Sequence, residues 1–227
     1  YLEGKDFNVD PNNPELSVRR SPGYPIFFGI HYAIWGEPNT YFVIRYTQIL
    51  IHLLALVLLG QAIYNLSSNS NWAKVTAFLY AINPFTISYL YSTMTESLSP
   101  SYVIFVVFAF SICYKKATSL NYFLLGTITA ISSLHRPFLG LLLPSLTLAL
   151  LFNNLRVFKS FSLIRQQIYL FASLFLGVAL IFSPWVIRNY FSTNGDIVFL
   201  EKYYYGDQMD YGRGHEKFRQ WVGHWTN

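Results

Sequence analysis

Charged and polar side chains that stand beside long apolar runs are the residues of this sequence most able to do chemistry. They are Arg19, Arg20, Arg45, Glu96, His135, Arg136, Arg188 and Asn189. A charge at membrane depth costs roughly 2.5–3.5 kcal/mol on insertion scales, so such groups usually face a cavity or a partner. Arginine carries a planar fork of donors that matches phosphate oxygens. Several arginines with one carboxylate therefore predict a site for an anion such as a phosphate or a pyrophosphate.

The same residues also allow plainer interpretations. The arginines could extend their side chains to lipid headgroups, and His135 could be packed or solvated. Glu96 could stabilise the start of a helix, because acidic residues favour that end. Arg45 is the hardest to explain in this way, since it stands one turn inside an apolar run.

The composition decides where these residues must sit. The chain is 53% hydrophobic and 19% aromatic but only 12% charged, against about 25% charged residues in an ordinary soluble domain. A soluble core of this length could not hide so much apolar surface, so the excess is expected to face lipid. The net charge of +5 does not indicate nucleic-acid binding, because the basic residues are scattered between apolar runs.

The apolar runs predict an all-α, polytopic transmembrane bundle that forms one membrane domain, 1–227. We place six spans near 41–64, 73–92, 98–114, 119–134, 137–152 and 167–186. Residues 24–35 are too short to cross a bilayer, which needs about 20 residues, and are rich in aromatic residues. They predict a juxtamembrane helix at the interface. Residues 1–40 and 187–227 are then outer segments that flank the spans.

The charges predict the orientation of this bundle. Three connections, near 65–72, 115–118 and 153–166, carry Lys74, Lys115, Lys116, Arg156, Lys159 and Arg165. All 11 acidic residues lie on the other side. Short loops rich in Lys and Arg remain in the cytoplasm, so the polar residues with chemical potential are expected to face the exterior.

Metal binding has weak support in the sequence. The C-terminal segment holds Asp207, Asp210, His215, Glu216 and His224, whose spacing matches no compact metal motif. We therefore predict no defined metal site and no certain cofactor, while a divalent metal stays open as an alternative.

Five short features, taken in order, resemble those of GT-C membrane glycosyltransferases, which include the bacterial protein O-mannosyltransferases and aminoarabinose transferases. The segment Arg20-Ser21-Pro22-Gly23-Tyr24-Pro25 resembles their R-x-P-G-Y-P motif. Arg45 opens a span, Glu96 follows the outer segment 90–95, His135-Arg136-Pro137 separates two spans, and residues 184–190 close the last one. The resemblance covers most of the chain, although each motif is short.

The resemblance implies an enzyme that moves a sugar from a polyprenyl-phosphate carrier to a lipid, glycan or protein acceptor on the outer face. Arg20 would bind the donor phosphate, with Arg136 second and Arg19 beside them. Tyr24, Arg45, His135 and Arg188 would line the substrate pocket. Glu96, which is an Asp in some relatives, would hold a metal, orient Arg20 or bind the acceptor.

The chain begins at Tyr1, and the Asp that serves as general base in such families is expected upstream. We therefore expect a fragment that lacks the first span and the C-terminal part. One cysteine and the lack of a credible outer glycosylation sequon favour a bacterial inner membrane over the endoplasmic reticulum. Two alternatives stay open: a transporter or flippase of an anionic lipid-linked sugar, and a non-catalytic membrane assembly subunit.

Overall fold

The described part of the chain is built from helices. The computed structural model describes residues 21–153 and 161–192, and these contain no strand. The helices in chain order are α1 (Gly23–Trp35), α2 (Asn39–Ser67), α3 (Ser70–Ala81), α4 (Pro84–Tyr89), α5 (Thr95–Lys115), α6 (Ser119–His135), the 3-10 helix η2 (Pro137–Leu141), α7 (Leu142–Asn153) and α8 (Phe161–Ser192). This confirms the predicted all-α class.

Three of the described helices are long and apolar enough to cross a membrane. They are α2, the α5 segment from Glu96 to Lys115 and the α8 segment from Ser162 to Phe191, which contain the predicted spans 41–64, 98–114 and 167–186. The shorter α6 follows the predicted span 119–134 closely. Helix α8 continues to Ser192, so the first residues of the predicted outer segment 187–227 are helical.

Two predicted spans are each divided between two helices. The run 73–92 is split into α3 and α4, where the Asn83 side chain accepts a hydrogen bond from the Phe85 amide and caps α4. Pro84 follows at the first helical position, which tolerates proline because that amide needs no partner. The run 137–152 begins with Pro137 as the short helix η2 before α7.

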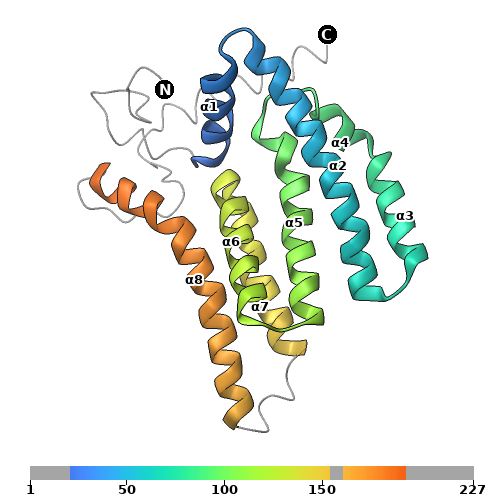
Figure 1. The fold of residues 1–227 in the computed structure, drawn as a ribbon, viewed down its shortest axis with the longest axis vertical. Helices are drawn as coiled ribbons and strands as arrows, with labels where there is room; N and C mark the ends of the chain where they lie inside the picture. Colours follow the sequence, from blue (N-terminus) through green and yellow to red (C-terminus); the bar gives the residue numbers. More distant parts are fainter. Residues whose placement is uncertain (1–20, 154–160, 193–227) are drawn as a thin grey trace, which may run out of the picture.

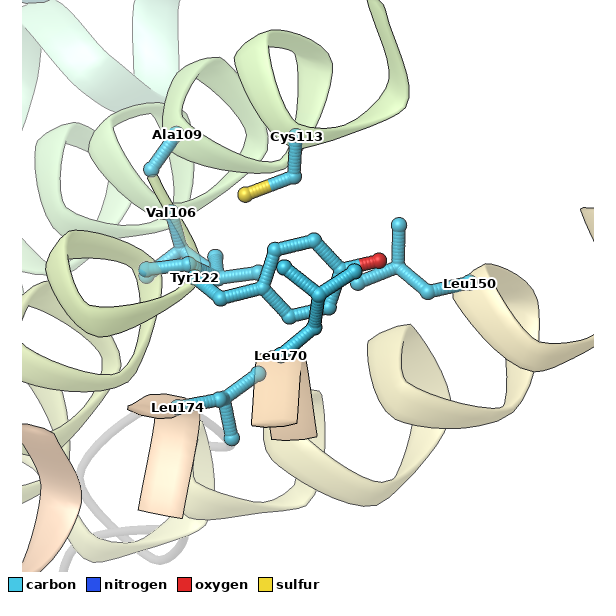
Figure 2. Packing of buried hydrophobic residues seen from close by; sticks show 8 residues of the cluster. Val106, Ala109, Cys113, Tyr122, Leu150, Leu170 and Leu174 are labelled. Carbon is cyan, nitrogen blue, oxygen red and sulfur yellow. The ribbon is translucent and has the colours of Figure 1, made fainter. Parts of the chain in front are cut away.

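Helix α5 joins the two halves of the bundle (Figure 1). On one side it packs against α2, which packs in turn on α3; on the other side it packs against α6, which packs on α8. A core cluster fills the second half, formed by Val106, Ala109, Cys113, Tyr122, Leu125, Leu150, Leu170 and Leu174. Figure 2 shows the ring of Tyr122 between the side chains of α5 and those of α7 and α8.

Burial on α2 is reversed relative to a soluble helix. Its buried face carries Thr40, Ile44, Gln48, His52, Ala55 and Ala62, while Phe42, Leu50 and Val57 are exposed. Polar side chains inside and large apolar side chains outside are the arrangement expected where the surroundings are lipid.

The turns between helices gather at two ends of the bundle (Figure 1). The first, here called the α1 end, holds α1, the turn before α2, the start of α5 and the end of α6. The second, here called the basic end, holds the α2–α3 and α5–α6 turns. Lys74, Lys115 and Lys116 are exposed there, and Lys115 lies over the Tyr64 ring.

Candidate functional site

The α1 end is assembled by close contact between the start of α1 and the end of α6. A Cβ atom on Gly23 would collide with the backbone of Leu134 and His135, so only glycine allows this approach. The Ser21 hydroxyl lies 3.4 Å from the His135 carbonyl oxygen and donates to it. That carbonyl belongs to the last turn of α6, where carbonyls lack helical partners. The motif around Gly23 is therefore docked on the motif around His135.

His135 is buried between two tyrosine rings. Its ring centroid lies 5.7 Å from that of Tyr24, edge to face, and 4.6 Å from that of Tyr102. Tyr24 comes from α1 and Tyr102 from α5, so this cluster ties three helices together. Aromatic packing of this kind fixes ring positions as well as burying area.

Pro137 determines where Arg136 goes. A residue before proline is pushed out of the helical region, and Arg136 is extended, with φ −146° and ψ 113°. Its guanidinium Nη1 lies 2.6 Å from Oε1 of Glu96, and the Arg136 and Glu96 side chains are 29% and 39% exposed. The guanidinium also lies over the Phe138 ring, with Cζ 5.3 Å from its centroid.

Glu96 stands in the first turn of α5. The amide dipoles of a helix start favour a negative charge there. Glu96 can therefore stabilise the start of α5 and pair with Arg136 at the same time. Because both side chains are partly exposed, the pair adds little to stability. A partly exposed guanidinium beside a carboxylate at this end of the bundle can instead bind an anion and orient a hydroxyl group.

Tyr24 presents a neutral phenol to this end of the bundle. Burial raises the pKa of Tyr24 to about 12; the Gln48 side chain lowers it, and the Glu96 carboxylate raises it. The hydroxyl therefore stays protonated at physiological pH and is a hydrogen-bonding group there, not an anion.

Two buried residues of α2 that the sequence interpretation missed lie beneath the pair. The Gln48 side chain reaches Ser97, the residue after Glu96, and His52 Nε2 lies 2.6 Å from the Ser97 carbonyl oxygen. Their signal in the sequence is the spacing: two polar residues four apart inside an apolar run share one helix face.

The structure brings together four of the predicted site residues: Tyr24, Glu96, His135 and Arg136. Arg45 is exposed on α2, beside the exposed aromatic residues Tyr41, Phe42 and Tyr46. Its surroundings match an arginine that extends to lipid headgroups.

Arg188 lies in the last turns of α8. Its guanidinium stacks over the Trp185 ring, with Cζ 5.0 Å from the centroid, and its Nη1 donates to the Asn189 side chain at 3.2 Å. In Figure 1 this end of α8 diverges from α6 and stands apart from α1.

Arg19, Arg20 and the C-terminal residues Asp207, Asp210, His215, Glu216 and His224 lie outside the described residues. Arg20 directly precedes Ser21, which contacts His135. Within 21–153 and 161–192, no three His, Cys, Asp or Glu side chains gather closely enough to hold a metal ion.

Comparisons of the chain with protein-family models, curated proteins and solved structures find no match.

Proposed function

We propose that this chain belongs to a membrane glycosyltransferase of the GT-C type, which takes a sugar from a polyprenyl-phosphate donor. One observation carries the proposal. Three motifs far apart in the sequence meet at the α1 end: Ser21–Tyr24 at the start of α1, Glu96 on α5 and His135–Arg136 at the end of α6. A purely structural membrane bundle does not require an arginine and a carboxylate to meet beside this aromatic cluster.

The chemistry of transfer suits these groups. The bond between the sugar and the carrier phosphate breaks as the acceptor hydroxyl attacks, and the departing phosphate keeps the electron pair. Arg136, together with Arg20, would stabilise that charge as a donor already in place. Glu96 would hold Arg136 in position or bind the acceptor hydroxyl. The hydroxyl proton passes to a general base as the new bond forms.

The proposal also includes a membrane topology with more crossings than the three long helices alone would give. The six predicted runs would cross the bilayer, with α3–α4 and η2–α7 as broken or tilted crossings, and the α1 end would face the periplasm of a bacterial inner membrane. Support comes from the two-ended distribution of charge, with Lys74, Lys115, Lys116 and Arg165 exposed on the helices and turns away from α1.

The test is a transfer assay with the full reading frame in membranes. Radiolabelled polyprenyl-phosphate sugars are supplied, and label that reaches lipid, glycan or protein acceptors is measured. We expect Arg136→Ala to lower kcat by about 10²–10³-fold, as for loss of one preorganised donor, and Arg20→Ala and Glu96→Gln to lower it as well. Arg165→Ala is the matched arginine control, and Glu37→Gln is the carboxylate control.

Full activity of Arg136→Ala and Glu96→Gln, at equal protein level, would contradict the assignment of the site. If no carrier sugar supports transfer while labelled donor still crosses the bilayer, the protein is a flippase, and the transferase proposal is wrong. If labelled donor neither reacts nor crosses the bilayer, the result favours the other alternative, a non-catalytic membrane assembly subunit.

A further inference from the structure

In the turn of α5 that carries Glu96, the amide and the hydroxyl of Ser97 both donate to the Met94 carbonyl oxygen, at 3.2 and 2.7 Å. Met94, at the N-cap position, makes no side-chain capping bond. Pro100 lies inside α5 and has no amide hydrogen, so the helical bond to the Glu96 carbonyl, four residues earlier, does not form. The start of α5 therefore lacks a side-chain cap and one helical bond, and contacts from elsewhere in the bundle add to its local bonds.

Gln48 on α2 makes such contacts at both ends of the segment. Its amide fits in the orientation that places Nε2 3.1 Å from the Leu90 carbonyl oxygen and 3.3 Å from that of Ser92, with Oε1 accepting from Ser97 Oγ at 2.8 Å. The reverse orientation would face the amide oxygen toward two carbonyl oxygens, which cannot donate. Gln48 is fully buried.

His52, one turn further along α2, holds the same segment. Its Nε2 lies 2.6 Å from the Ser97 carbonyl oxygen, which only accepts, so Nε2 carries the hydrogen. Its Nδ1 then accepts from the Tyr80 hydroxyl at 2.8 Å and lies 3.1 Å from the Ser101 hydroxyl. The imidazole is therefore fixed in one orientation by α3 and α5 together.

We propose that Gln48 and His52 are positioning residues, which fasten residues 90–97 to α2 and so place the Glu96 carboxylate on Arg136. Their catalytic consequence rests on the proposed function, whereas their effect on the segment does not. A buried carbonyl left without a donor is costly, so removing the Gln48 amide displaces Leu90 and Ser92 toward new partners. Ser97, the neighbour of Glu96, loses its contact with Gln48 as well and keeps the His52 bond to its carbonyl, so the Glu96 carboxylate is held less firmly against Arg136.

The first measurement is hydrogen exchange of the purified full chain in lipid nanodiscs. Gln48→Leu keeps a similar side-chain volume but loses every side-chain hydrogen bond. Gln61→Leu is its control, since Gln61 is exposed on α2 and, among the described residues, bonds Asn65. We expect amides in 90–97 to exchange about tenfold faster in Gln48→Leu, as for loss of buried hydrogen bonds. Exchange in Gln61→Leu is expected to match the wild type.

His52 supplies a second pair of variants in case Gln48→Leu does not insert. The amide nitrogen of His52→Gln can still donate to Ser97, whereas His52→Leu cannot donate. Faster exchange in His52→Leu with recovery in His52→Gln supports the proposal. Unchanged exchange of 90–97 in both leucine variants overturns it, whether or not the protein transfers sugar.

Transfer kinetics then test the link to Glu96. Gln48→Leu is expected to lower kcat by roughly tenfold to a hundredfold, the effect of a small misplacement, with KM for the donor unchanged. Combined with Glu96→Gln it should add no further loss, because both changes act through one carboxylate. If the two losses of kcat multiply in the double variant, Gln48 does not act through Glu96 and its positioning role is wrong. If residues 90–97 exchange faster in the leucine variants but no protein, wild type included, transfers sugar, the positioning of this segment by Gln48 and His52 is supported and the transferase proposal is wrong.

Discussion

At the scale of single residues, the candidate site depends on backbone geometry as much as on charge. Pro137 turns Arg136 out of α6, and Gly23 lets α1 lie on the end of that helix. Glu96 meets Arg136 only because both backbones are held in place. Changes that leave every charged group intact should therefore still disturb the site.

Gly23→Ala tests this directly. The added methyl group collides with the backbone of His135, and overpacking of this kind costs about 1–3 kcal/mol. We expect α1 to detach from α6, with a lower unfolding temperature and a large loss of transfer activity. Thermal unfolding in detergent and the transfer assay measure the two effects.

Gly29→Ala is the matched control, because it lies on the same helix with open space around its Cβ position. It should be neutral or slightly stabilising, since alanine favours helices by about 0.8–1.0 kcal/mol over glycine. Equal behaviour of the two variants would show that the contact with His135 is dispensable.

The sequence singles out residues at helix ends more readily than residues within helices. Glu96, His135 and Arg136 interrupt the ends of apolar runs and were found for that reason. The sequence interpretation names Arg45 within the same apolar run and does not name Gln48 or His52. On a helix with apolar residues on all sides, the sequence does not tell the lipid-facing side from the packed side. The buried face of α2 carries Ile44, Gln48 and His52, whereas Arg45, the residue after Ile44, is exposed.

At the scale of elements, the crossing of α6 and α8 depends on two glycines. A Cβ atom on Gly126 would collide with the Leu174 carbonyl, and one on Gly177 with the Phe123 carbonyl. Small residues allow such close approach between helices in membranes, where van der Waals packing replaces the hydrophobic effect. Helix α6, which ends at His135, is therefore placed by its contact with α8.

Gly126→Ala should separate α6 from α8. We expect destabilisation by about 1–3 kcal/mol from the overpacked contact, read as a lower midpoint of thermal unfolding in detergent. Gly60→Ala on α2 serves as the control, because its Cβ would meet its nearest neighbours at 3.9 Å, an ordinary contact. A midpoint unchanged in Gly126→Ala would mean that the two helices are not held at this distance.

Apolar runs located the helices but not the breaks inside them. The run 73–92 holds α3 and α4, although Asn83 and Pro84 already carried the signal of a helix start. Both halves are apolar because both meet lipid or protein, so composition alone cannot show the interruption. The same holds for 137–152, where Pro137 opens a 3-10 turn.

At the scale of the whole molecule, the bundle has polar side chains inside and apolar side chains outside, and its described acidic residues and lysines lie at opposite ends. The α1 end carries the acidic residues Glu37 and Glu96, and the described turns of the basic end carry exposed lysines. In a bilayer, basic short loops stay on the cytoplasmic side. The arrangement therefore gives one expected orientation, which can be tested position by position.

Cysteine labelling of intact cells tests this orientation and the crossing by α3 and α4. Cys113 is buried, so Cys113→Ala provides a background in which Glu37→Cys, Asn71→Cys and Lys116→Cys each place one exposed thiol. We expect a membrane-impermeant maleimide to label Glu37→Cys, and to label the other two only after permeabilisation. Because α2, the α3–α4 pair and α5 lie between residues 37 and 116, labelling of Glu37→Cys and Lys116→Cys from the same side would mean that α3–α4 re-enters without crossing. Labelling of the basic end alone would reverse the orientation and place Arg136 and Glu96 in the cytoplasm, where a donor carried to the outer face could not reach them.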